Sequence, residues 1–159
     1  MKITIITVGK IKEKYLKDGI DEYLKRLRPY TPLEIVELTP IEIKDENLVE
    51  KVLDAEAEKI ISHIKPSSFI ITMEIEGKQF YSVDFSKKLE QIGNSGVSEI
   101  VFIIGSSCGL SKKVRDMSNL KLSLSIAILV SNPVPQPISR ILSKSLRSKS
   151  ENNFSAILF

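Results

Sequence analysis

The residues with the clearest potential for chemistry lie in one glycine-bounded segment, Gly105-Ser106-Ser107-Cys108-Gly109. Its spacing matches the G-x-S-x-G pattern, in which the central serine, here Ser107, is the nucleophile of a strand-to-helix turn. In that arrangement the histidine base follows the nucleophile in the chain, whereas the only histidine, His63, precedes it. A serine hydrolase that uses Ser107 is therefore the weakest of the functional hypotheses.

The same segment favours a second interpretation, because glycine lets bare backbone approach a small ligand closely. Open α/β sheets bind ligands at the carboxyl ends of their strands, and this segment follows an apolar run at 100–104. A plain strand-to-helix connection is the structural alternative. Neither a G-x-G-x-x-G fingerprint nor a P-loop is present, and one Cys with one His does not make a zinc site, so no metal is expected.

Cationic side chains gather near the amino terminus. Residues 1–30 hold eight Lys or Arg against four acids, although the formal net charge of the 159-residue chain is only +3. Such a surface suits the phosphates of a nucleic acid, and a solvated surface of mixed charge is the alternative.

Alternating strands and helices must position these residues. β-Branched and apolar residues at 2–8 predict a buried strand, and the apolar spacing over 12–27 predicts a helix with a basic outer face. The same patterns predict strands at 33–38, 68–75, 100–104 and 120–130, and helices over 45–64, 82–92 and 111–117. This order predicts a three-layer α/β fold with a mostly parallel sheet, built as a single domain over residues 1–159.

Composition sets the cellular setting and separates the carboxyl-terminal tail from the rest. A single Cys is typical of a reducing compartment, and no apolar stretch is long enough to span a bilayer, so we expect a cytoplasmic protein that does not cross a membrane. Residues 131–159 hold seven serines, and three prolines fall within 133–137. This composition predicts an atypical tail with at most a short, poorly packed helix.

Several blocks of sequence match a known family with collinear spacing over residues 1 to about 125. They include Val8-Gly9-Lys10-Ile11-Lys12, Tyr23-Leu24-Lys25-Arg26-Leu27, Thr72-Met73-Glu74-Ile75-Glu76-Gly77-Lys78, Phe102-Ile103-Ile104-Gly105 and Leu122-Ser123-Leu124-Ser125. These blocks resemble the RlmH family of ribosomal RNA large-subunit methyltransferases, which belongs to the SPOUT superfamily.

The resemblance implies an α/β domain tied into a trefoil knot, a homodimer, and S-adenosylmethionine as cofactor. It also implies methylation of a pseudouridine in ribosomal RNA, free or in the assembled ribosome. By resemblance, the cofactor pocket is formed by Met73, where the family usually has Leu, with Gly105, Leu124 and Ser125. The RNA is then expected to meet the cationic residues Lys10, Lys12, Lys14, Lys17 and Arg26.

After Ser125 the sequence departs from the family pattern, and no catalytic residue is assigned by resemblance. In the family this stretch supplies the knotted helix and much of the dimer face. A second hypothesis is therefore an inactive relic that keeps RNA binding or dimer formation without methyl transfer.

Overall fold

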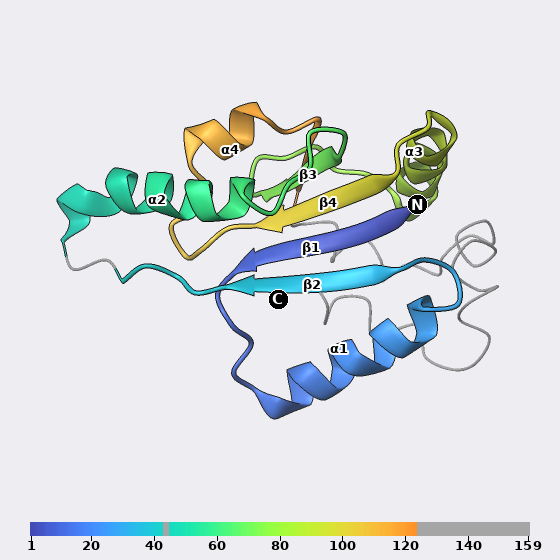
Figure 1. The fold of residues 1–159 in the computed structure, drawn as a ribbon, viewed down its shortest axis with the longest axis horizontal. Coiled ribbons are helices and arrows are strands. Elements are labelled where there is room, and N and C mark those ends of the chain that lie inside the picture. The colour runs from blue at the N-terminus through green and yellow to red at the C-terminus, as the bar shows by residue number, and fades with distance from the viewer. Residues whose placement is uncertain (43–44, 124–159) are drawn as a thin grey trace.

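The computed structural model describes residues 1–42 and 45–123, which form a five-stranded sheet with accompanying helices (Figure 1). The strands are β1 (Lys2–Val8), β2 (Leu33–Leu38), β3 (Phe69–Glu74), β4 (Glu99–Ile104) and β5 (Leu120–Ser123). The helices are α1 (Lys14–Leu27), α2 (Val49–Ile61), α3 (Ser82–Asn94) and α4 (Lys112–Asp116), and a 3-10 turn η1 (Glu46–Leu48) precedes α2. The predicted extension of the last strand to residue 130, the tail 131–159 and the knot all fall outside the described residues.

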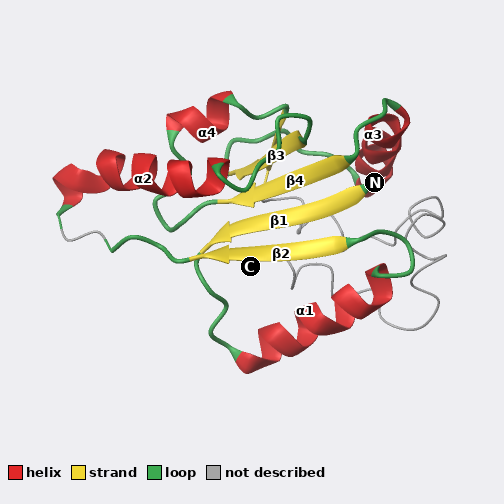
Figure 2. Cartoon of the chain, in the orientation of Figure 1, coloured by secondary structure: helices red, strands yellow, loops and turns green. Residues whose placement is uncertain are grey.

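The strand order is β2-β1-β4-β3-β5, and every pairing between these strands is parallel. This confirms the predicted α/β fold and parallel sheet. All five strands therefore point the same way, and their carboxyl ends form one edge of the sheet, called here the carboxyl edge. Figure 2 shows this common direction for β1, β2 and β4. The opposite edge, where the strands begin, is the amino edge.

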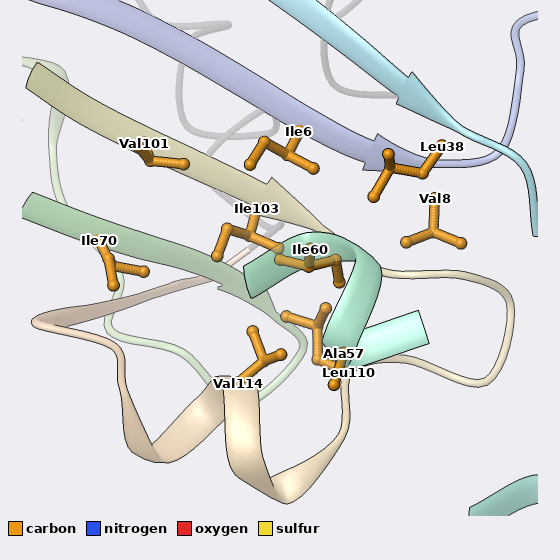
Figure 3. Close-up of a cluster of buried hydrophobic side chains, with 10 residues drawn as sticks. All are labelled: Ile6, Val8, Leu38, Ala57, Ile60, Ile70, Val101, Ile103, Leu110 and Val114. Atoms are coloured by element: carbon orange, nitrogen blue, oxygen red, sulfur yellow. The ribbon is translucent and has the colours of Figure 1, made fainter. Parts of the chain in front are cut away.

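Two apolar clusters cover the two faces of the sheet. On one face Ala57 and Ile60 of α2 and Val114 of α4 pack against sheet residues such as Ile6 and Ile103 (Figure 3). On the other face, residues of α3 pack against β3, β4 and β5; they are Phe85, Leu89 and Ile92. Helices on both faces give the predicted three layers.

Most predicted elements are confirmed, and the start of α2 is the clearest difference. The sequence predicts helix from Asp45, but α2 begins at Val49 after the 3-10 turn. Asp45 Oδ1 accepts hydrogen bonds from the backbone and side-chain nitrogens of Asn47, both at 2.9 Å. This local bonding competes with the α-helical pattern and delays the helix by one turn. Ser111, where the sequence predicts a helix to begin, caps α4, because its hydroxyl accepts from the Val114 backbone nitrogen.

Candidate functional site

Neighbouring strands send their connections to opposite faces at the carboxyl edge. The chain after β3 leads to α3 on one face, and the chain after β4 leads to α4 on the other. In open α/β sheets such a switch leaves a crevice between the strand ends, and this is where ligands bind. The segments that border this point are the turn after β4, the loop after β3 and the end of β5.

The turn after β4 is built from two glycines in close approach. A side-chain carbon at Gly105 would lie 2.3 Å from the Gly109 carbonyl oxygen, far inside any normal contact. Gly109 has a φ of +86° and donates its N–H to the Ser106 carbonyl oxygen at 2.8 Å. Both glycines are therefore required by the turn itself, whether or not a ligand meets the exposed backbone.

Ser106 has an unusual hydroxyl within this turn. Its Oγ atom is buried and has no hydrogen-bond partner among the described residues. A buried hydroxyl without a partner costs free energy, so a polar group that arrived with a ligand would relieve the cost. Beyond the turn, Leu110 and Ser111 line an open groove of about 390 Å³ against the start of α2.

Met73 lies on β3 beside Ile104, one residue before the Gly105 turn in the register of the sheet. Its side chain is 5% exposed and belongs to the apolar cluster under α3. The next residue, Glu74, faces a small polar group that sequence reasoning missed. The buried Thr72 hydroxyl lies 2.7 Å from Glu74 Oε1 and 2.9 Å from Ser118 Oγ. This group holds a carboxylate at the carboxyl end of β3.

The loop after β3 is fastened to β5. The Lys78 N–H donates to the Lys121 carbonyl at 2.7 Å, and the Ser123 N–H donates to the Lys78 carbonyl at 3.0 Å. Gly77 makes this possible, because a side-chain carbon there would lie 2.3 Å from the backbone of Leu122. The sequence signal was a glycine in the short loop after a predicted strand, which is compatible with close approach of another backbone.

With this geometry in place, the comparison with known families is decisive. A family model described as "Predicted SPOUT methyltransferase" matches residues 1–132. The chain belongs to the SPOUT methyltransferase family.

Relatives within this SPOUT family are close. The ribosomal RNA large subunit methyltransferase H of Streptococcus pneumoniae (strain CGSP14) is 46% identical over 126 residues, which cover 77% of this chain and 79% of the relative. A protein of Methanococcus maripaludis (strain C5 / ATCC BAA-1333), which carries the same name in provisional form, is 50% identical over 133 residues. That match covers 79% of this chain and 80% of the relative. The resemblance stated from the sequence blocks is confirmed.

The SPOUT fold brings two of the four expected cofactor residues together. Met73 and Gly105 lie at the ends of adjacent strands, although the Met73 side chain is packed in the core. Leu124 and Ser125 fall outside the described residues. β5 ends one residue before them, with Ser123 beside Glu74.

The expected RNA contacts divide into two groups. Lys10, Lys12, Lys14 and Lys17 are exposed, and none forms an ion pair within residues 1–42 and 45–123. Since Thr7 of β1 pairs with Ile104 of β4, the chain that carries these lysines leaves the sheet beside the Gly105 turn. Arg26 is different, because its guanidinium binds Glu22 at 2.9 Å in the last turns of α1, toward the amino edge.

The serine hydrolase hypothesis gains no support from the geometry. Ser107 follows β4 at the carboxyl edge, whereas His63 lies between α2 and β3 at the amino edge. The His63 ring nitrogen Nδ1 lies 2.8 Å from the Lys59 carbonyl. Cys108 is exposed. No group of three His, Cys, Asp or Glu side chains in the described chain could hold a metal, and no helix described there is long and apolar enough to cross a membrane.

Charge at the amino edge is arranged in another way, around the buried carboxylate of Glu99. Thr4 and Ser68 donate hydroxyl hydrogen bonds to it at 2.8 and 3.1 Å, and the ammonium groups of Lys2 and Lys65 lie 3.4 and 3.5 Å away. Burial alone raises the pKa of Glu99, but the hydrogen bonds and the two lysines outweigh it, so the pKa lies below its ordinary 4.5. Glu99 is therefore a satisfied structural anion.

Proposed function

We propose that this protein is an S-adenosylmethionine-dependent methyltransferase that modifies a pseudouridine of large-subunit ribosomal RNA in the cytoplasm. The observation that carries the proposal is its membership of the SPOUT family together with 46% identity to a relative named for ribosomal RNA methylation. The carboxyl edge of the sheet supports it, because Met73, Gly105 and the unpaired lysines are found there.

The residues of the carboxyl edge fit the cofactor of such an enzyme. Adenine pockets are largely apolar, and the apolar side chain of Met73, one residue before the polar end of β3, suits one wall. An added carbon at Gly109 would meet nothing within 4 Å, so the backbone there is uncovered, and the partnerless Ser106 hydroxyl offers one further hydrogen bond. We propose Met73, Gly105, Leu124 and Ser125 as the binding residues.

The chemical demand on the protein is modest. S-adenosylmethionine, when bound, supplies an electrophilic methyl group on a sulfonium. The chain then has to hold the acceptor nitrogen of the base in line and to exclude water, and loss of the proton from the base is a secondary need. A site without a metal or a nucleophilic side chain suffices for this chemistry.

RNA binding rests on the unpaired lysines of the segment 10–17. Four exposed ammonium groups without carboxylate partners in the described chain can each neutralise a phosphate and release counterions. The segment that carries them leaves the sheet beside the Gly105 turn, which supports phosphate contacts and a cofactor site at the same edge. We propose the ribosome or its RNA as the partner, and a homodimer as the working unit.

A second candidate is an inactive relic that binds RNA or dimerises without transferring methyl groups. The observation that favours this candidate is that residues 133–159 lie beyond the match to the family model. Both candidates predict RNA binding, so only catalysis separates them.

The deciding experiment supplies radiolabelled S-adenosylmethionine and ribosomes that lack the modification. Label in large-subunit RNA at a pseudouridine, located by mass spectrometry, establishes the proposed function. Cofactor and RNA binding without label transfer identifies the relic. Absence of heat in calorimetry with millimolar S-adenosylmethionine on folded protein contradicts the cofactor site. Light scattering on the same sample reports the dimer.

A further inference from the structure

Tyr15 is displayed to solvent in a way that packing does not explain. It lies in the first turn of α1, and 72% of its surface is exposed. The apolar side of α1 is formed by other residues, namely Leu16, Ile20, Tyr23, Leu24 and Leu27. An aromatic ring away from the buried stripe of its helix contributes little to folding.

Gly19 keeps the neighbourhood of this ring open. Helical side chains lean toward the helix amino terminus, so a side chain at position 19 would lie over Tyr15 one turn earlier. A side-chain carbon at Gly19 would meet no atom within 4 Å, and its φ is an ordinary helical one. Neither packing nor backbone conformation therefore requires glycine here, yet glycine within a helix is unfavourable.

Cations without ion-pair partners lie close to Tyr15 in the sequence. They are Lys12, Lys14 and Lys17, with Lys10 before them, and none is paired within the described residues; Glu13 and Asp18 lie in the same stretch. An exposed aromatic ring on a segment with unpaired lysines can bind single-stranded nucleic acid: the ring stacks on a base and the lysines meet the flanking phosphates. The first turn of α1 lies at the carboxyl edge, the same edge as the Gly105 turn (Figure 1).

We propose that Tyr15 is a stacking platform for an unpaired base of the RNA substrate, with Gly19 leaving room for that base. This inference rests on the proposed function and goes beyond it by naming the contact and the form of RNA, a single-stranded segment. Tyr15 acts as a positioning residue, because it holds the RNA beside the site and takes no part in methyl transfer.

The first test measures binding of a fluorescein-labelled oligouridylate by anisotropy at fixed salt. Stacking losses measured by alanine substitution in other proteins predict roughly tenfold weaker binding for Tyr15→Ala and near-normal binding for Tyr15→Phe. Tyr30→Ala is the matched control, because Tyr30 is also exposed, at 45%, but lies beyond the other end of α1. Equal affinities of Tyr15→Ala and Tyr30→Ala would overturn the proposal.

The second test reports contact directly. The sequence contains no Trp, so Tyr15→Trp places a single indole at the platform. Its fluorescence should be quenched by the oligonucleotide, and an unchanged emission on saturation contradicts stacking. Gly19→Gln should weaken binding by covering the ring, whereas Gly19→Ala should not. If the unmodified protein binds no RNA at all, the proposed function fails as well. If the unmodified protein binds RNA and the Tyr15 and Gly19 variants bind it equally well, only the stacking proposal fails.

Discussion

The two edges of the sheet differ in whether their charged groups have partners. At the amino edge, Glu99 is enclosed by two hydroxyls and two ammonium groups. At the carboxyl edge, lysines of the segment 10–17 have no carboxylate partner in the described chain, and the Ser106 hydroxyl has no hydrogen bond there. The amino edge is complete without a ligand, and the carboxyl edge is not. Such unsatisfied groups concentrate where proteins bind other molecules.

The largest effect expected at the carboxyl edge comes from filling the glycine turn. Gly105→Val should lower the free energy of unfolding by about 3 kcal/mol, because the new side chain meets the Gly109 carbonyl. Gly93→Ala is the control, since its added carbon comes no nearer than 3.8 Å to Met1 and alanine favours the helix. Urea unfolding measures both. A Gly105→Val protein as stable as the unmodified chain would show that the close approach is dispensable.

At the amino edge, Glu99→Ala should cost about 1–3 kcal/mol of stability, because the Thr4 and Ser68 hydroxyls lose a buried acceptor. Asp116→Ala should change stability little by comparison, since its ion pair with Lys112 is exposed. An equal loss of stability in the two variants would mean that the buried carboxylate of Glu99 contributes no more than an exposed ion pair.

Acidification offers a second way to test Glu99. Its folded pKa lies below the ordinary 4.5, so ionised Glu99 stabilises the fold at pH above that value. This contribution should decline as the pH falls below about 4.5 and disappear once the pH is below the folded pKa. The free energy of unfolding, measured at a series of pH values, should therefore change less with pH for Glu99→Gln than for the unmodified chain. The same pH dependence of the free energy of unfolding in both proteins would mean that Glu99 has the same pKa in the folded and unfolded states.

Salt dependence sharpens the comparison at the carboxyl edge. Replacing Lys10, Lys12, Lys14 and Lys17 by alanine should flatten the plot of log affinity for RNA against log salt by about 0.7 for each phosphate that is no longer neutralised. Replacing Lys112 and Lys113 is the control, because these lysines are paired with Asp116 and Glu58. An equal change in the slope of log affinity against log salt for both sets would show that RNA binding does not depend on the lysines of segment 10–17 in particular.

The smallest effect is expected for Arg26→Ala. This guanidinium is already bound to Glu22 and lies 12 positions beyond Lys14 on α1, about 18 Å along the helix. RNA affinity should fall less than for Lys14→Ala at equal salt. A larger fall would place the RNA along the whole of α1.

The sequence predicts local elements better than the environment of single residues. Strand β1 has its predicted bounds because its apolar run is continuous. The strand order places β4 between β1 and β3, and periodicity contains no information about such long-range neighbours. The buried role of Glu99 was missed for the same reason, since its partners Thr4 and Ser68 are distant in sequence. The ion pair between Glu22 and Arg26 could have been predicted from its four-residue spacing on a helix. It would have distinguished Arg26, which has a carboxylate partner, from the unpaired lysines.

The strand order also has a consequence for synthesis of the chain. β1 and β2 can pair early, but both neighbours of β3 come after it in the sequence. At translation rates of about 5–20 residues per second, β3 waits roughly 2–6 s for residue 104 to be added and β4 to be complete. During that interval the unpaired backbone N–H and C=O groups beside the apolar side chains of Ile70 and Ile71 are an open template for other nascent chains. Chaperone demand should therefore peak between completion of β3 and completion of β4, and a translational pause there should raise aggregation.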